Sequence, residues 1–214
     1  MRGLFLIFIS LTFSIVISSS AYAKQLKFII DDALGKDNVS FTSDAPIELI
    51  VGRTNMITGE VILDESLDLS KSPVNVFFSV DLASIDTGIA LRNEHMRDNF
   101  LHTKKYPDAT FKVKKISVDA PKLSDGEPVK LIAKGALSIH GITVEREIPV
   151  KVTYFKESEF THNRFEHGDL IKVQSSFDVP FKDHKIQRPE VLFQKLTDTV
   201  TVTVDVYANL KANN

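Results

Sequence analysis

Cysteine is absent from the 214 residues of the chain. Without it the protein has no disulfide framework, so its stability must come from the burial of apolar side chains and from hydrogen bonds. A metal site with thiolate ligands is excluded for the same reason. A lipid anchor attached to an N-terminal cysteine is excluded as well.

Long hydrophobic runs are scarce, and the one clear example lies at the N-terminus. An apolar run over residues 4–17 follows Arg2, and the small residues Ala21 and Ala23 follow the run at alternate positions. This order is typical of a secretory signal peptide, and the run is short against the ~20 residues of a membrane-spanning helix. We expect a cleaved signal peptide at 1–23 and a soluble, exported domain at 24–214 without a transmembrane span. A retained membrane anchor is the alternative.

An excess of charge of one sign is also missing. The 26 basic and 28 acidic side chains nearly balance, and the formal net charge is −2. Proteins that bind nucleic acid usually carry a basic patch or stripe that neutralises phosphates. We therefore expect no nucleic-acid partner.

Motifs that carry catalysis are missing too. The sequence has no G-x-S-x-G nucleophile turn, and no pair of acids marks a glycosidase cleft. Its six histidines show neither H-x-x-x-H nor H-E-x-x-H spacing. His162 and His167 lie in a polar stretch that we interpret as a solvated loop. The expectation is a protein that is not an enzyme, with no catalytic residues, no metal and no cofactor.

What the chain does contain is apolar–polar alternation with a period of two residues. It is clearest at residues 74–82, 129–137, 148–154, 171–179 and 200–206, and weaker at 26–30, 39–42, 47–51, 60–63 and 109–118. Such alternation is typical of antiparallel strands with one buried face. The pattern predicts about nine or ten strands in one all-β domain, as a barrel or a sandwich.

The side chains on the inward faces of these strands are mostly large and aliphatic, with the smaller Ala133 and Gly135 among them. A closed sheet of about eight strands either fills its interior with side chains or holds one small ligand, and periodicity does not distinguish the two. If the barrel is hollow, we expect the channel to be lined by Val76, Phe78, Val80, Leu131, Leu137, Val150, Val152, Phe177, Val202 and Val204.

The charged stretch at residues 90–100, ALRNEHMRDNF, interrupts the alternation. Ile89, Met96 and Phe100 fall on one face of a helix, and residues 86–88 supply capping and turn residues. The pattern predicts one short helix at about 88–100, lying across one end of the β-structure.

Three stretches resemble the YceI-like family. They are VGRTNMITGEVILD at 51–64, DLASIDTGIALRNEHMRDNFLHTKKYPDATFKV at 81–113 and GALSIHGITVEREIPVKV at 135–152. The middle stretch is the most specific, because its S-I-D-T-G, R-x-E-H-M-R, K-Y-P and F-K elements come in the family's order. The resemblance implies an extended antiparallel, lipocalin-like β-barrel in the periplasm. It also implies an apolar channel that holds a polyisoprenoid or a similar long amphiphile.

On this resemblance the residues 90–100 form a cap or rim at a barrel end. Arg92, His95 and Arg97 are then candidates for contact with an anionic headgroup, beside Met96 and Phe100, because arginine binds phosphate through two charge-assisted hydrogen bonds. The alternative is that these charges pair within the protein and hold the shape of the rim. We further expect His140-Gly141 to form a hairpin turn and the Tyr106 ring to pack inside the barrel.

The leading hypothesis is a non-enzymatic protein that binds, transports or stores a long-chain isoprenoid or other amphiphilic lipid; a homodimer is left open. One alternative is an enzyme acting on an isoprenoid phosphate, with His95 or His184 as acid or base. Another is an interaction domain with a solid core that docks a partner through residues 157–169.

Overall fold

The computed structural model describes residues 24–31, 35–71, 75–163, 165, 167–188 and 194–211. The predicted signal peptide and Val74 lie outside these residues. Ten strands were found: β1 (Gln25–Ile30), β2 (Asn38–Ala45), β3 (Glu48–Thr54), β4 (Ile57–Asp64), β5 (Asn75–Asp81), β6 (Asp108–Val118), β7 (Pro128–Ile139), β8 (Ile142–Phe155), β9 (Leu170–Pro180) and β10 (Thr199–Leu210). The helical elements are η1 (Leu82–Ser84), α1 (Ala90–His95), the π-turn η2 (Met96–Phe100), α2 (Glu159–His162) and η3 (Phe181–His184).

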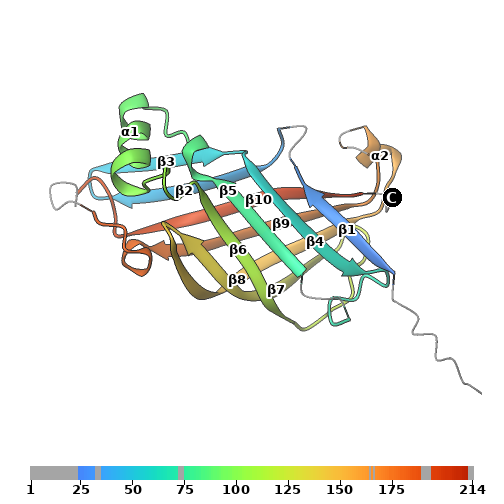
Figure 1. Ribbon diagram of the computed structural model, residues 1–214. Helices are drawn as coiled ribbons and strands as arrows, with labels where there is room; N and C mark the ends of the chain where they lie inside the picture. The colour runs from blue at the N-terminus through green and yellow to red at the C-terminus, as the bar shows by residue number, and fades with distance from the viewer. Residues whose placement is uncertain are drawn as a thin grey trace, which may run out of the picture.

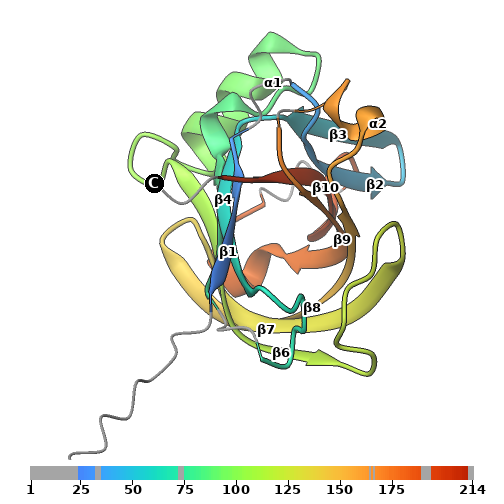
Figure 2. The same ribbon diagram turned by 90° about the vertical axis from the view of Figure 1, so that its right-hand side faces the viewer.

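Eight of the strands close into an antiparallel barrel in the order β1-β4-β5-β6-β7-β8-β9-β10, and β10 pairs back onto β1. The closing register is Phe28 opposite Leu210. Figure 2 shows this ring of strands nearly end on. The sequence prediction of an extended antiparallel barrel with a short helix near one end is therefore confirmed.

The hairpin β2–β3 lies outside the eight-stranded ring. β2 pairs with the first half of β10, from Thr201 opposite Thr42 to Asp205 opposite Asn38. The far edge of β3 reaches the chain after η1 through reciprocal backbone hydrogen bonds of 2.9 Å between Arg53 and Asp86. These two strands extend the wall at the end of the barrel that carries α1 (Figure 1). No helix in the described part of the chain has the length and apolar character needed to span a bilayer.

Local sequence explains two details of the wall. The two-residue turn between β7 and β8 has positive φ at both His140 (53°) and Gly141 (73°), which suits a tight hairpin and confirms the predicted turn. A bulge at residues 113–115 of β6 lies opposite Gly135. A Cβ on Gly135 would lie 2.3 Å from the Lys112 carbonyl oxygen, so this glycine lets the bulged strand approach. It does not widen the interior.

One end of the barrel is filled by side chains. Phe28, Val206 and Ala208 are completely buried there, and Leu63 and Leu123 are nearly so. These residues come from the strands on either side of the closing seam and from the loop between β6 and β7. They plug the barrel at the end away from α1, whereas at the other end residues of α1 and η2 line the interior.

The helix at 88–100 is present, but it starts differently from the prediction. Its N-cap, Ile89, makes no capping hydrogen bond. Instead Asn93 reaches back: its Oδ1 accepts from both N–H and hydroxyl of Thr87, and its Nδ2 donates to Asp86. The Asn93 amide and the Gly88 N–H together lower the pKa of Asp86. The sequence prediction gave residues 86–88 the role of capping the helix. In the structure the buried Asn93 instead fixes the start of the helix through its hydrogen bonds to Thr87 and Asp86.

Candidate ligand-binding site

An apolar cavity of about 560 Å³ occupies the barrel interior. Every strand except β1 contributes side chains to its wall. Along β9 the lining runs from Ile171 to Val179 at alternate positions, a span of about 26 Å at ~3.3 Å per residue. The cavity is therefore long and narrow, and it can hold an extended apolar chain.

All ten residues that the sequence prediction placed in a channel line this cavity: Val76, Phe78, Val80, Leu131, Leu137, Val150, Val152, Phe177, Val202 and Val204. The opposing walls surround a hollow instead of meeting along the whole axis. The alternative of a solid core is therefore wrong.

Part of the lining was not predicted from the sequence. Ile50 and Gly52 of β3 contribute, and so do Ile186 and Leu196 beyond β9. Gly52 matters because a Cβ there would lie 2.3 Å from Cε1 of the Phe41 ring. The glycine therefore leaves room for the Phe41 ring beside β3, and both residues line the cavity. The positions were hard to find because β3 has little alternation.

We call the end of the cavity beside α1 the mouth. Arg92 of α1 links α1 there to Thr87 and to the start of β3. Its Nε donates to the Thr87 hydroxyl and its Nη2 to the Thr87 carbonyl, both at 2.9 Å. Its Nη1 forms an ion pair with Glu48 at the start of β3. Arg92 is one of the residues that line the cavity, yet its guanidinium nitrogens donate to protein acceptors. For Arg92, the structure shows the interactions that the rim-shape alternative expects.

The other predicted rim residues divide into two groups. His95, Met96 and Phe100 line the cavity beside Arg92. Arg97 is not among the lining residues, and its Nη1 instead reaches the Ala83 carbonyl oxygen at 3.5 Å. Lys195 is a cationic lining residue that the sequence prediction missed.

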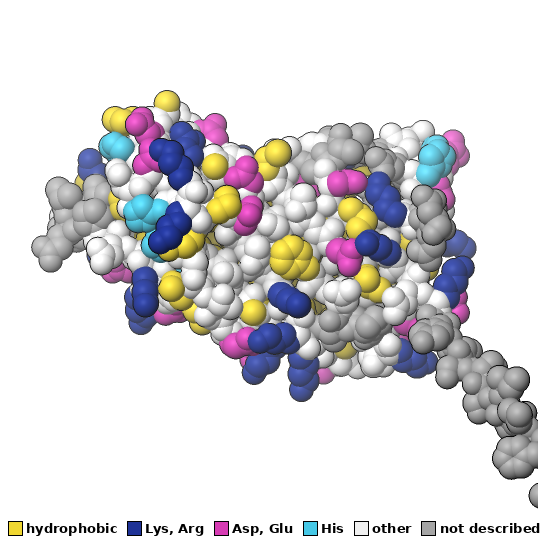
Figure 3. Space-filling view, in the orientation of Figure 1, with side chains coloured by type: hydrophobic (Ala, Val, Ile, Leu, Met, Phe, Trp, Pro, Cys, Tyr) yellow, Lys and Arg dark blue, Asp and Glu magenta, His cyan; other side chains and the backbone are white. Residues whose placement is uncertain are grey.

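Exposed apolar side chains occur at the same end. Leu91 of α1 is 60% exposed, and Ile47 and Leu49 of the β2–β3 hairpin are each 62% exposed. Ile89 is half exposed. Figure 3 shows hydrophobic side chains mixed with charged ones at the end that carries α1. Apolar side chains of α1 and of the β2–β3 hairpin are therefore exposed at the end of the barrel where α1 lines the cavity.

His184 is a buried histidine next to the mouth, but it does not line the cavity. Its side chain is 1% exposed, and its Nδ1–H donates to the Ile142 carbonyl at 3.1 Å. Burial lowers the pKa of His184, which is therefore neutral near pH 7. A histidine shut off from the cavity cannot exchange protons with a ligand there, so the enzymatic alternative loses one of its two candidates.

Hydrogen bonds link three histidines, His102, His140 and His184, at the β7–β8 turn. His140 Nδ1–H donates to the His184 carbonyl at 3.1 Å, so in the neutral ring Nε2 accepts from His102 Nδ1–H at 2.8 Å. The Tyr106 ring packs edge-on against His140, with 5.0 Å between ring centroids. The prediction that the Tyr106 ring lies inside the barrel is wrong; the positive φ of Gly141 turns the hairpin so that the ring covers it from outside.

Comparisons with solved structures agree with this architecture. BcnA of Burkholderia cenocepacia superposes with a TM-score of 0.63 at 20% identity, covering 84% of this chain and 99% of that one. A polyisoprenoid-binding domain from Saccharophagus degradans gives a TM-score of 0.63 at 19% identity, covering 88% and 100%. The YceI protein of Campylobacter jejuni gives 0.53 at 19% identity, covering 99% and 100%.

At these identities the likeness establishes the fold alone. No curated protein matches the sequence significantly. The sequence model of the YceI-like domain, however, matches residues 31–208, which is most of the chain. The match includes all the described residues that line the cavity. The chain therefore belongs to the YceI-like family.

Proposed function

We propose that the protein binds one long apolar chain, a polyisoprenoid or a similar amphiphilic lipid, inside the barrel. The observation that carries the proposal is the elongated cavity lined almost throughout by aliphatic and aromatic side chains. Membership of the YceI-like family supports it, as does the fold shared with a polyisoprenoid-binding domain.

Burial of apolar area supplies the affinity in this proposal. At ~25 cal/mol per Å², a few hundred square ångströms of buried ligand surface contribute several kcal/mol before the costs of ordering the ligand. The plug around Phe28 closes one end. The tail therefore enters from the α1 end and the headgroup stays at the mouth.

The polar contacts of the headgroup are a second part of the proposal. His95 and Lys195 line the cavity at the mouth and can donate to an anionic group. Arg92 already donates to Thr87 and Glu48, so its role in this proposal is to position α1. Arg97 contributes less, because it lies outside the cavity.

The role that follows is transport or storage without chemistry, in the periplasm after export. The interior is hydrophobic and the buried His184 is not among its lining residues, which favours binding over turnover. Loading from and delivery to a membrane would use the exposed apolar side chains at the mouth. A homodimer stays a prediction.

The experiment is native mass spectrometry of protein purified without detergent from its own host, followed by organic extraction. We expect a mass increment of one lipid per chain and recovery of a long-chain amphiphile in the extract. A protein that is unliganded, and that also fails to take up added polyprenyl phosphate, would contradict the proposal.

A further inference from the structure

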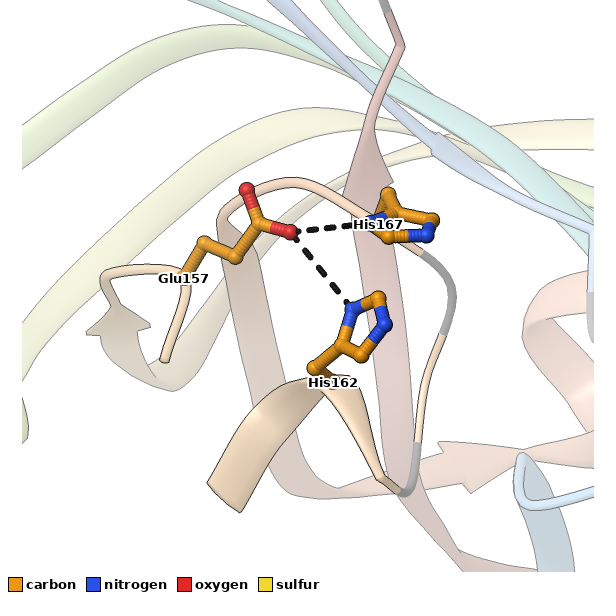
Figure 4. A group of neighbouring side chains, drawn as sticks. All are labelled: Glu157, His162 and His167. Carbon is orange, nitrogen blue, oxygen red and sulfur yellow. Dashed lines mark hydrogen bonds and ion pairs between the residues drawn. The ribbon is translucent and has the colours of Figure 1, made fainter. Parts of the chain in front are cut away.

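A cluster of two imidazoles and one carboxylate lies at the end of the molecule opposite the cavity mouth. Glu157 follows β8, His162 ends α2, and His167 precedes β9. Oε1 of Glu157 lies 3.2 Å from Nδ1 of His167 and 3.7 Å from Nδ1 of His162. Figure 4 shows both rings turned toward that single oxygen. All three ligand atoms lie within 4.8 Å of one another.

These separations suit a shared metal ion. Zinc binds imidazole nitrogen and carboxylate oxygen at about 2.0–2.2 Å, so two ligands of a tetrahedral ion lie about 3.3–3.5 Å apart. The distances of 3.2 and 3.7 Å from Glu157 bracket that value. Three exposed protein ligands also leave a fourth position for water.

The backbone that carries the cluster is fixed on both sides. Asp169 accepts from the Glu157 N–H at 2.8 Å and from the Tyr154 hydroxyl at 2.6 Å, which joins the two ends of the loop. Ser158 forms a capping box that starts α2 and places His162 one turn later. The ligands are therefore held near one another before any ion binds.

Two hydrogen bonds hold the Glu157 carboxylate in place. The Gly168 N–H donates one of them, and the His167 ring makes the other at 3.2 Å. Gly168 has a φ of 108°, and a Cβ there would lie 2.8 Å from the Leu210 carbonyl oxygen. Only glycine fits this close turn, and the turn brings His167 back over Glu157.

We propose that Glu157, His162 and His167 form a binding site for a divalent transition metal, with Zn²⁺ as the ion of choice. Two imidazole nitrogens and one carboxylate oxygen match zinc, whereas Mg²⁺ and Ca²⁺ take oxygen ligands almost exclusively. The site does not depend on the lipid-binding proposal. The ligands lie at the start, middle and end of the loop between β8 and β9. A bound ion would therefore hold the parts of that loop together beside the plugged end of the barrel.

The test is calorimetric titration of tag-free, chelator-treated protein with ZnCl₂. We expect one zinc ion per chain. The double variant His162→Gln/His167→Gln should bind zinc at least tenfold more weakly. Removing a group that only supports a metal ligand typically lowers metal affinity 10–100-fold, and these two residues are ligands themselves. His102→Asn is the matched control: it removes an exposed imidazole from the other end, suits the positive φ of 47° there, and should leave the affinity unchanged. MgCl₂ should give no binding heat.

A second measurement assigns the site. Zinc should shift the ring ¹⁵N signals of His162 and His167 and slow amide exchange at residues 158–163. No zinc binding up to 1 mM, unchanged affinity in the double variant, or shifts confined to His102 and His140 would each overturn the proposal and leave these groups as ordinary His–Glu ion pairs. Lipid uptake by the double variant should equal that of the unmodified chain, so failure of one proposal is distinguishable from failure of the other.

Discussion

Val202 of β10 offers the sharpest test of the lipid site. It lines the cavity and lies in register with two aromatic lining residues, Phe41 of β2 and Phe177 of β9. In Val202→Asp a carboxylate faces the interior. Water can hydrate that carboxylate in an unliganded cavity, so the variant should still fold.

Lipid binding strips that water away. Leaving an ionised group without partners against an apolar tail costs several kcal/mol, and each 1.4 kcal/mol is a factor of ten in affinity. We expect Val202→Asp to weaken the binding of a polyprenyl phosphate by at least roughly 100-fold, measured by titration of delipidated protein.

Thr203→Asp is the matched control, because Thr203 is the next residue on the same strand and is exposed on the outer face. It should bind the lipid like the unmodified chain. If the folded Val202→Asp variant retains full affinity, or if both variants lose it equally, the assignment of the inward face as the binding wall is refuted.

Three further predictions follow from the mouth, from β3 and from the buried histidine. Arg92→Ala removes the contacts to Thr87 and Glu48, so it should lower the free energy of unfolding by about 1–2 kcal/mol, measured by urea titration. Amide exchange in α1 should become faster. Unchanged exchange would show that Arg92 does not hold the rim in place. Gly52→Ala puts a methyl group against Phe41 and should cost about 1–3 kcal/mol by the same assay, whereas Val51→Ala at its neighbour should cost less. Burial lowers the pKa of His184 in the folded protein. As the pH falls, the imidazole is therefore protonated in the unfolded chain before it is protonated in the folded one, and the free energy of unfolding should decrease below about pH 6.5. Comparing His184→Gln with the unmodified chain between pH 7.5 and 5.5 measures this, and an equal pH slope in both would contradict it.

The period-two pattern was enough to find the strands and the inward faces, because alternation records which side of a strand is buried. For example, Val200, Val202 and Val204 all line the cavity as their spacing predicts. Alternation does not record which strands are neighbours. The position of β2–β3 beside β10 and the plug around Phe28 therefore became visible only in the structure.

The mouth was predicted less completely than the wall. Leu196 and Ile186 line the cavity from a part of the chain without alternation. Arg97 is not a lining residue, although Arg92 in the same segment is one. Rim residues are placed by irregular segments whose path depends on tertiary contacts, such as the hydrogen bonds of Asn93 to Thr87. The proximity of Glu157 to His162 and His167 was not predicted for a similar reason, since the spacing of the three residues follows no known motif and depends on the turn at Gly168.

Methyl NMR of lipid-loaded protein tests most directly whether the barrel is a hollow container for a lipid tail. Inward methyl groups of Val150 and Val202 should show cross-relaxation with the protons of a bound polyprenyl chain, whereas Ile132, which points outward and is 40% exposed, should show none. Cross-relaxation between methyl groups of opposite walls along the whole axis, with lipid contacts only at the rim, would contradict the account.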